Sequence, residues 1–294
     1  MENTNHEMSL KGNWMKDNTH LKRMAVVSDL SCYGRCALTV ALPIISAMGI
    51  ECCPIPTVVL STNGAFPGYV TQNMSEFMKK VSAHFETLGL SFDGIVSGFY
   101  NSPHQIAVTE EMFRKVKNER ERQPLIFVDP IMGDHGKLYS VSTSEIVSGL
   151  CKLLSYADVI TPNLTECCAL LGTTYPRETP SEKDLINMTE RLHELGPKRV
   201  IITGLDRGDT IENFVSDQGE THSILTLRIG GDRSGTGDVF LSVLAGSMVA
   251  GIEFLPAVKK ATDFLSKAIV LAEQYQLPPN SGVCFEQCLS ELYN

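Results

Sequence analysis

The chain has 294 residues, a mass of 32.3 kDa, a formal net charge of −9 and a pI near 5.3. The acidic balance argues against a dedicated nucleic-acid-binding protein, which would present a basic face, and a hydrophobic content of 43% suffices for a large buried core. No window approaches the roughly 20 uncharged apolar residues of a membrane span, so we expect a cytoplasmic protein that binds neither nucleic acids nor membranes.

Residues 1–22 lack apolar periodicity and are predicted to form a flexible leader, which leaves a single domain over residues 23–294. In that domain, short apolar runs alternate with helical patterns. In chain order the predicted elements are strand 24–28, helix 37–48, strand 56–60, helix 73–88, strand 94–97, helix 103–120, strand 125–128, helix 143–154, strand 158–160, helices 163–171 and 182–195, strand 199–203, a hairpin of strands 211–215 and 224–227, and helices 236–251, 255–276 and 284–292. Repeated strand–helix units with continuous apolar strands predict an α/β fold whose parallel sheet is covered on both faces, and the hairpin predicts an antiparallel edge.

Polar or glycine-bearing residues follow almost every predicted strand. They include Asp29, Asn63-Gly64, Phe99-Tyr100, Asp129, Thr161 to Asn163, and Thr203. Parallel sheets bind ligands at the carboxyl ends of their strands, so we expect these residues to line one crevice. Each residue alone is more often a turn former or a helix cap, so the prediction depends on their joint occurrence.

The run Gly235-Thr236-Gly237-Asp238 leads directly into an apolar helical pattern. Unpaired backbone N–H groups at a helix N-terminus bind anions, and glycines let a phosphate approach the backbone closely. Asp238 would repel that phosphate unless a reaction needs a carboxylate there to take the proton of an attacking hydroxyl. The run therefore predicts phosphoryl transfer. The alternative is that Asp238 is only a favourable acid at a helix start and the glycines only make a turn.

Two further acids suit a divalent cation. Asp129 directly follows a buried strand, and Glu166 lies in the first turn of a helix that Asn163 is able to cap. Mg²⁺ prefers hard oxygen ligands, keeps several waters and bridges to nucleotide phosphates. We therefore expect Asp129 and Glu166 to bind Mg²⁺, with a simple capping box as the alternative for Asn163 and Glu166.

In this order and spacing, the motifs resemble those of the ribokinase superfamily of small-molecule kinases, and within it the pyridoxal/pyridoxine (vitamin B6) kinase branch. The segments that carry the resemblance are 33–34, 56–61, 97–99, 129–134, 161–166 and 235–238, together with the first strand. The resemblance implies a three-layer αβα sandwich with a mostly parallel central sheet. It also implies a homodimer.

The resemblance assigns the catalytic roles to the last motif. Asp238 would be the catalytic base toward the 5′-hydroxymethyl group of the substrate, and Gly235, Thr236 and Gly237 would form the anion hole for the γ-phosphate. ATP and its Mg²⁺ would lie among polar residues at the strand ends, which are Asp129, Thr161, Asn163, Glu166 and Thr203.

The same resemblance places the substrate over Asp29, Asn63 and Gly64, with Phe99 or Tyr100 against the pyridine ring. Two of these positions depart from the better-known B6 kinases. Asp29 stands where many members carry Ser, and Asn63-Gly64-Ala65 replaces a loop that contains His and Thr. Asp29 either faces a protonated ring nitrogen or a polar ring substituent, or it caps its loop.

The loop 132–139 resembles the B6-kinase form. Its His135 and Lys137 either move over the nucleotide phosphates or are solvated loop residues. The expected function is ATP-dependent phosphorylation of pyridoxal, pyridoxine and pyridoxamine. One alternative is the same chemistry on hydroxymethylpyrimidine or another small alcohol. Another is a nucleotide- or vitamer-binding protein without turnover, and Asp238 counts against it because such a protein has little use for a carboxylate beside a phosphate site.

Overall fold

The computed structural model describes residues 21–118 and 123–293. Most of the predicted leader, residues 1–20, therefore lies outside the described residues, as does the predicted end of the helix at residue 120. The first strand begins at Arg23, immediately after the predicted leader.

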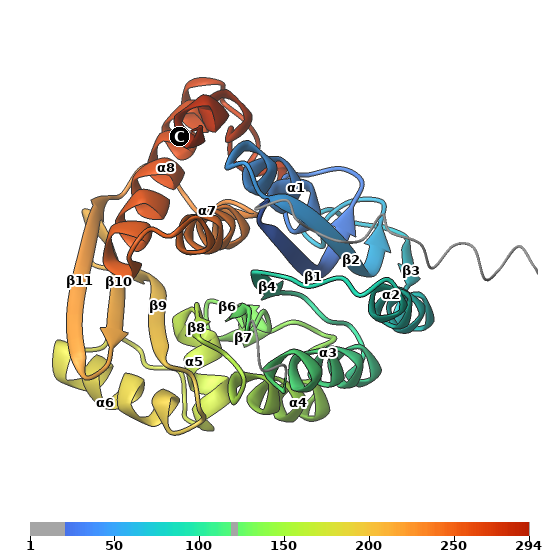
Figure 1. Cartoon of the computed structure of the whole chain (residues 1–294). Coiled ribbons are helices and arrows are strands. Elements are labelled where there is room, and N and C mark those ends of the chain that lie inside the picture. The colour runs from blue at the N-terminus through green and yellow to red at the C-terminus, as the bar shows by residue number, and fades with distance from the viewer. Residues whose placement is uncertain (1–20, 119–122, 294) are drawn as a thin grey trace, which may run out of the picture.

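A nine-stranded sheet runs through the described part of the chain in the order β11-β10-β9-β8-β5-β4-β1-β2-β3 (Figure 1). Its strands are β1 Arg23–Ser31, β2 Glu51–Leu60, β3 Thr71–Asn73, β4 Gly94–Ser97, β5 Leu125–Val128, β8 Val159–Ile160, β9 Arg199–Asp206, β10 Thr210–Asp217 and β11 Glu220–Leu227. The six central strands, from β9 to β2, pair in parallel. The strands β6 Gly133–Asp134 and β7 Lys137–Leu138 form a separate small hairpin.

Both edges of the sheet are antiparallel, whereas the sequence predicted only one such edge. The predicted hairpin forms β10 and β11, and β10 also pairs antiparallel with β9. At the other edge β3, a strand that was not predicted, pairs antiparallel with the end of β2. All three residues of β3 are exposed and polar, so no apolar pattern marks this strand in the sequence.

Helices cover both faces of the sheet, as the βα units predicted (Figure 1). The helices α1 Leu38–Ala47, α7 Thr236–Ala250 and α8 Phe254–Gln274 pack into one apolar core. The opposite core contains side chains of α2 Ser75–Thr87, α3 Pro103–Lys117, α4 Ser144–Leu154, α5 Leu164–Leu171 and α6 Glu182–His193. In β1 the side chains alternate between the two cores, with Met24 and Val26 in the first and Ala25 and Val27 in the second. The predicted three-layer αβα sandwich is confirmed.

Several elements differ from their predicted bounds, among them β2 and the last predicted helix. The strand β2 begins at Glu51, five residues before the predicted start, and it includes Pro54 and Pro56. Proline is tolerated there because β3 pairs only with residues 58–60, which leaves the first part of β2 at an open edge. The predicted last helix is instead a 3₁₀ segment, η3 Glu286–Leu292, which follows the short η2 Pro279–Ser281.

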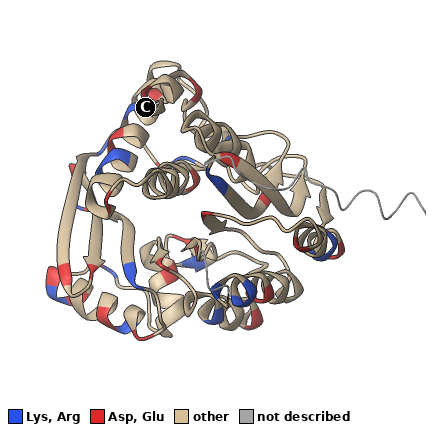
Figure 2. Cartoon of the chain, in the orientation of Figure 1, with Lys and Arg blue, Asp and Glu red and all other residues tan. Residues whose placement is uncertain are grey.

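The outer surface carries charges of both signs. Figure 2 shows acidic and basic residues interspersed along α2 and α3, and Lys115 of α3 pairs with Glu86 of α2 at 2.6 Å. Within the described ranges, every helix is too short or too polar to cross a bilayer.

The chain order of the strands fixes where a ligand site forms. From β1 the chain continues to β2 and β3 on one side, and then returns to place β4, β5, β8 and β9 on the other side. The direction in which successive strands are added to the sheet therefore reverses between β1 and β4. In open α/β sheets, the crevice at the carboxyl ends of the strands beside such a reversal is the usual ligand site.

Candidate active site

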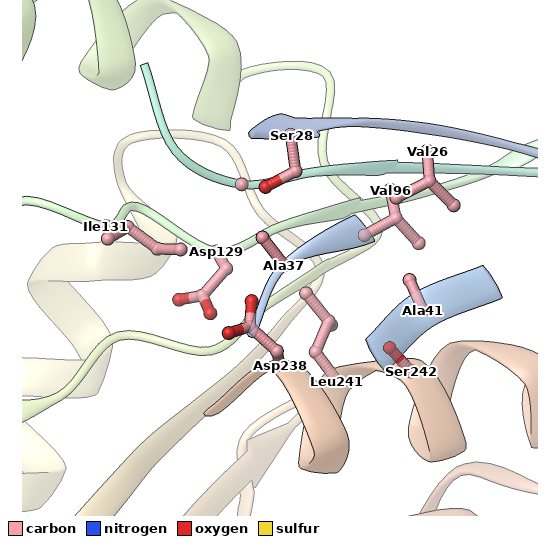
Figure 3. Close-up of a pocket in the computed structure, with 11 residues that line it drawn as sticks. Val26, Ser28, Ala37, Ala41, Val96, Asp129, Ile131, Asp238, Leu241 and Ser242 are labelled. Carbon is pink, nitrogen blue, oxygen red and sulfur yellow. The ribbon is translucent and has the colours of Figure 1, made fainter. Parts of the chain in front are cut away.

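A pocket lies at this reversal point, between the ends of the strands and two helices (Figure 3). Its walls come from β1, β4, the segment after β5, α1 and α7, and the lining residues are Val26, Ser28, Ala37, Ala41, Val96, Gly98, Asp129, Ile131, Asp238, Leu241 and Ser242. The enclosed volume of about 10 Å³ holds roughly one water molecule. It is therefore the narrow base of the site and not a complete substrate cavity.

The predicted phosphate-binding run forms the start of α7, and we call Gly231 to Gly237 the anion loop. Gly235 is the residue before the helix and has φ of 76°. A Cβ there would lie 1.9 Å from the carbonyl oxygen of Arg35, so both the backbone angle and the packing require glycine. No side chain of the described residues caps α7, which leaves its first amides available to an anion.

Asp238 lies in the first turn of α7 and is half-buried. Burial raises the pKa of its carboxyl group above the ordinary value, and a hydrogen bond from the backbone amide of Ala37 partly opposes this rise. Ala37 has φ of 49°, an uncommon angle for a residue with a side chain. This conformation aims the Ala37 amide at the Asp238 carboxylate.

Asp129, at the end of β5, points its carboxylate toward that of Asp238 (Figure 3). Burial raises the pKa of Asp129 to about 8, and the nearby charge of Asp238 contributes to the rise. The anion loop is also close, because a Cβ on Gly237 would lie 3.6 Å from Asp129 Oδ2. The structure thus brings together an anion-binding helix start and two facing carboxylates.

Glu166 is 4% exposed and uses both carboxylate oxygens. Oε2 accepts the backbone N–H of Asn163 at 2.9 Å, and Oε1 accepts that of Met132 at 3.1 Å. Asn163 Oδ1 accepts the backbone N–H of Glu166 at 3.0 Å, which completes a capping box. Burial and the charge of Asp129 raise the pKa of Glu166. The capping box that the sequence left open is therefore present, and it holds this carboxylate beside Asp129.

Of the remaining residues assigned to the nucleotide, Thr161 directly follows β8, whereas Thr203 lies within β9, which continues to Asp206. The Thr161 hydroxyl is buried beside Asp129, whose pKa it lowers slightly, and it makes no hydrogen bond of ordinary geometry. Thr203 is half-buried and donates its backbone N–H to the Pro162 carbonyl at 2.9 Å. Both side chains stand on the side of the site where Asp129 and Glu166 lie.

Asp29, which was predicted to lie under the substrate, is 8% exposed and lies where the pairing of β1 with β2 shifts by one residue. Its Oδ2 accepts the Ser31 hydroxyl at 3.1 Å. Burial, and then the charge of Asp238, raise the pKa of Asp29 to about 7. No Lys, Arg or His of residues 21–118 and 123–293 forms an ion pair with it. Among the described residues, the Ser31 hydroxyl is the side-chain group that donates to this buried acid.

Asn63 lies near the site but uses its amide to hold its own loop. Its Nδ2 donates to the Asn280 carbonyl at 2.9 Å, and its Oδ1 accepts the backbone N–H of Ala65 at 3.0 Å. Gly64 is exposed, with no heavy atom within 4 Å of the place of a Cβ. In this arrangement one N–H of the Asn63 amide and its oxygen support the predicted substrate loop.

The two aromatic candidates after β4 differ in their surroundings. Tyr100 is 1% exposed and packs in the core formed with α3 and α4, so the structure does not bring its ring to the pocket. Phe99 is half-buried, and its backbone is held by the Ser28 and Thr57 hydroxyls. Of the two rings, only that of Phe99 is partly open.

Two side chains that were not selected from the sequence, those of Tyr139 and Asp134, also interact with the acids of the site. Burial and the charges of four carboxylates raise the pKa of Tyr139 to about 12, and these carboxylates belong to Glu166, Asp134, Asp129 and Asp238. Tyr139 and Asp134 belong to the loop 132–139, whose sequence resembles the B6-kinase form of this loop. The sequence gives no sign of which of its side chains turn toward the site.

His135, in the same loop, connects the β6–β7 hairpin to the anion loop. Its Nε2 lies 3.1 Å from Asp232 Oδ2, and both side chains are exposed. Lys137 is exposed in β7. The structure thus places His135 at the border of the predicted phosphate site.

Comparison with known proteins identifies the family. A family described as phosphomethylpyrimidine kinase matches residues 44–283, which include Asp129, Glu166 and Asp238. The chain belongs to the phosphomethylpyrimidine kinase family. Its ribokinase-like fold is the one that the sequence motifs implied.

Relatives in the phosphomethylpyrimidine kinase family include proteins with two different names. The chain is 28% identical over 235 residues to a bifunctional thiamine biosynthetic enzyme of Arabidopsis thaliana, covering 78% of this chain but only 42% of that enzyme. It is 27% identical over 248 residues to a pyridoxine/pyridoxal/pyridoxamine kinase of Bordetella avium, covering 81% of each.

A solved structure links the two names. A protein of Bacteroides thetaiotaomicron that is named after phosphomethylpyrimidine kinase was crystallised with pyridoxal. It superposes with a TM-score of 0.86 at 34% identity, covering 92% of this chain and 96% of that chain. This member of the phosphomethylpyrimidine kinase family therefore resembles both proteins named after a pyrimidine and proteins named after, or crystallised with, the pyridine compound pyridoxal.

Proposed function

We propose that the protein transfers the γ-phosphoryl group of ATP to the 5′-hydroxymethyl group of a vitamin B6 vitamer, with pyridoxal as the reference substrate. The observation that supports this most strongly is Asp238, a carboxylate held in the first turn of an uncapped helix N-terminus. A binding protein gains little from a carboxylate at an anion site, whereas phosphoryl transfer requires a proton acceptor there.

The proposed step uses groups of this chain for position and charge. The hydroxyl oxygen attacks the γ-phosphorus, the bond from that phosphorus to the β-phosphate oxygen breaks, and the hydroxyl proton passes to Asp238. Backbone amides of Gly235, Thr236 and Gly237 donate to the transferring oxygens and stabilise their charge. Burial favours the protonated form of Asp238, which suits it to accept that proton.

Mg²⁺ fits the donors that the site provides. The described residues contain no group of three or more His, Cys, Asp or Glu side chains arranged to hold a metal by themselves. Mg²⁺ is usually bound through one or two carboxylates, substrate phosphates and water, and the neighbouring carboxylates of Asp129 and Glu166 match this mode. We assign it to Asp129 and Glu166, where it would neutralise charge on the nucleotide phosphates.

Asp29 is proposed to recognise the ring of the vitamer. A buried carboxylate without a cationic partner is costly, and a ring N–H or a cationic substituent would supply the missing donor. Phe99 is the aromatic side chain placed to pack against the ring, and its partial exposure supports this role.

A second candidate substrate is hydroxymethylpyrimidine, which carries the same alcohol on an aminopyrimidine ring. The family description and the likeness to a thiamine biosynthetic enzyme favour it. The likeness to a protein crystallised with pyridoxal and the similar coverage of the Bordetella kinase favour the vitamers.

A coupled ADP-release assay with Mg-ATP tests this proposal. The substrates are pyridoxal, pyridoxine, pyridoxamine and hydroxymethylpyrimidine, each with a control without Mg²⁺. We expect the highest kcat/KM with a vitamer. Turnover of hydroxymethylpyrimidine alone would show that this compound, and not a vitamer, is the substrate. The absence of turnover with all four compounds would reject the proposed kinase activity.

We also propose that the protein is a cytoplasmic homodimer, which rests on the B6-kinase resemblance of the motifs. Sedimentation equilibrium of the full chain tests the assembly. A mass near that of two chains supports the dimer, and a mass of one chain contradicts it.

A further inference from the structure

The segment Leu277–Gly282 receives hydrogen bonds from three separate parts of the site, and we call it the C-terminal support. Its backbone carbonyls accept Asn63 Nδ2 at Asn280 (2.9 Å), Arg35 Nη1 at Ser281 (3.2 Å), the Ser234 backbone N–H at Pro279 (3.1 Å), and Arg233 Nη1 at Leu277 (3.0 Å) and Gly282 (3.4 Å). None of the five acceptors belongs to the pocket lining. The support therefore contacts the parts that carry the site without lining its base.

Arg233 anchors the anion loop to this support. Its side chain is 5% exposed, and its guanidinium donates to Glu273 Oε1 through Nη2 at 2.7 Å and Nε at 3.1 Å. Buried guanidinium groups with several directional hydrogen bonds hold a fixed geometry. The residue lies two positions before Gly235, and its carbonyl accepts the Thr236 hydroxyl at 3.3 Å. Its position therefore fixes the start of α7.

Asn63 anchors the predicted substrate loop to the same support. The side chain is 7% exposed, and its contact to Asn280 spans the molecule from the second strand to the C-terminal region. Gly34 packs against it so tightly that a Cβ there would lie 2.6 Å from Asn63 Nδ2. The amide of Asn63 is thus held between the support and the turn before α1.

The turn from Gly34 to Ala37 connects the two loops directly. Its Arg35 side chain donates to Ser281 and pairs with Glu286 at 2.6 Å. The Arg35 carbonyl packs on Gly235, and the Ala37 amide bonds to Asp238. A displacement of this turn or of the support would therefore move the anion loop and the substrate loop relative to each other.

From these contacts we infer that the C-terminal support fixes the separation of the substrate loop and the anion loop, with Asn63 and Arg233 as positioning residues that act through it. The inference rests on the proposed function, because it concerns where the hydroxyl meets the phosphate. Neither side chain needs to touch the reacting atoms. Misplacement by about 1 Å is sufficient to lower a rate by about a hundredfold, so the loss appears in kcat.

A double-mutant cycle of Asn63→Ala and Arg233→Lys tests the inference. The lysine keeps the charge but removes the forked donors. We expect each variant to lower kcat by about tenfold or more, with a smaller change in the KM for ATP, and the double variant to lose less than the product of the two losses. Independent, multiplicative losses, or kcat values near wild type, would overturn the inference.

Two matched controls separate positioning from general destabilisation. Asn73 makes the same local pattern as Asn63, since its Oδ1 accepts the Ser75 backbone N–H at 2.8 Å and its Nδ2 donates to Asn101 at 3.1 Å. Arg228 bonds to the Gly208 carbonyl and to Asp206, away from the site. Asn73→Ala and Arg228→Lys should keep the wild-type kcat, and a loss equal to that of the test variants would overturn the inference.

Amide hydrogen exchange tests the same inference without any turnover, so its result stays separate from that of the proposed function. Asn63→Ala should speed exchange in residues 231–238, which it does not adjoin in sequence, while Asn73→Ala should leave them unchanged. Unchanged exchange in residues 231–238 of Asn63→Ala would overturn the inference even if the wild-type protein phosphorylates a vitamer.

Discussion

The carboxylates of Asp129 and Asp238 face each other across the base of the pocket, one at the end of β5 and the other in the first turn of α7 (Figure 3). Neither forms an ion pair with a Lys, Arg or His of the described ranges 21–118 and 123–293. Burial, and then the nearby charge of Asp238, raise the pKa of Asp129 to about 8. A bound Mg²⁺ and the proton of an attacking hydroxyl would supply the positive charge that the pair lacks.

The anion loop should tolerate no side chain at Gly235. Gly235→Ala places a Cβ 1.9 Å from the Arg35 carbonyl at a positive φ, so the start of α7 must shift. We expect kcat to fall by at least about a hundredfold, with a loss of about 1–3 kcal/mol in the free energy of unfolding. Steady-state kinetics and urea denaturation measure the two effects. Gly231→Ala is the matched control, because no heavy atom lies within 4 Å of its Cβ position, and an equal loss there would contradict the explanation.

Asp29 should make stability depend on pH. Its pKa rises from the ordinary 3.8 to about 7 in the folded protein, so the folded state holds this proton more tightly than the unfolded state does. The associated stability is complete below pH 3.8 and is lost as the pH rises through about 7. Asp29→Asn should therefore raise the free energy of unfolding at about pH 8 by up to about 4 kcal/mol.

Urea denaturation across this pH range measures that gain. The gain should shrink toward zero below about pH 3, where Asp29 is protonated in both states. A gain that stays the same at both pH values would show that burial of charge at Asp29 is not its cause. The same variant should lose affinity for the vitamer, since it removes the negative charge proposed to face a ring N–H or a cationic substituent.

The two aromatic residues after β4 should respond differently to substitution. Phe99→Leu removes a partly open ring and should raise the KM for pyridoxal about tenfold, a loss in the range of one aromatic contact. Tyr100→Phe removes a hydroxyl that has no hydrogen bond of ordinary geometry in the core, so KM should stay near wild type. Steady-state kinetics of the two variants test the assignment: an unchanged KM for Phe99→Leu would contradict the ring contact of Phe99, and a raised KM for Tyr100→Phe would instead indicate a role for the Tyr100 hydroxyl.

The mostly parallel sheet, and the position of Asp129 at a strand end, were predictable from the sequence because both depend on local patterns. Buried strands such as Leu125–Val128 are continuous apolar runs, and a polar residue after each of them falls at the same sheet edge. The start of α7 was predictable for a similar reason, since glycines followed by an acid and an apolar helix leave few alternatives.

Other features depend on contacts between distant segments and left no local signal. Asn63 was expected to bind the substrate, which stays a prediction, and the sequence did not indicate that a carbonyl from the C-terminal region accepts an N–H of its amide. Tyr100 was also assigned to the substrate, but the packing of α3 and α4 places it in the core. Glu166 was expected to act either as a cap or beside the metal, and the structure puts its capping carboxylate next to Asp129, so the two expectations do not exclude each other.

The central claim is that Asp238 takes the proton of the attacking hydroxyl, and the kinetics of Asp238→Asn test it most directly. The substitution keeps the size of the side chain and removes its basicity. We expect kcat with pyridoxal to fall by a factor of about 10² to 10⁴, while the affinity for Mg-ATP, measured by calorimetry, is kept or improved because a negative charge beside the phosphates is lost. A variant that binds Mg-ATP and turns over pyridoxal at the wild-type rate would contradict the account.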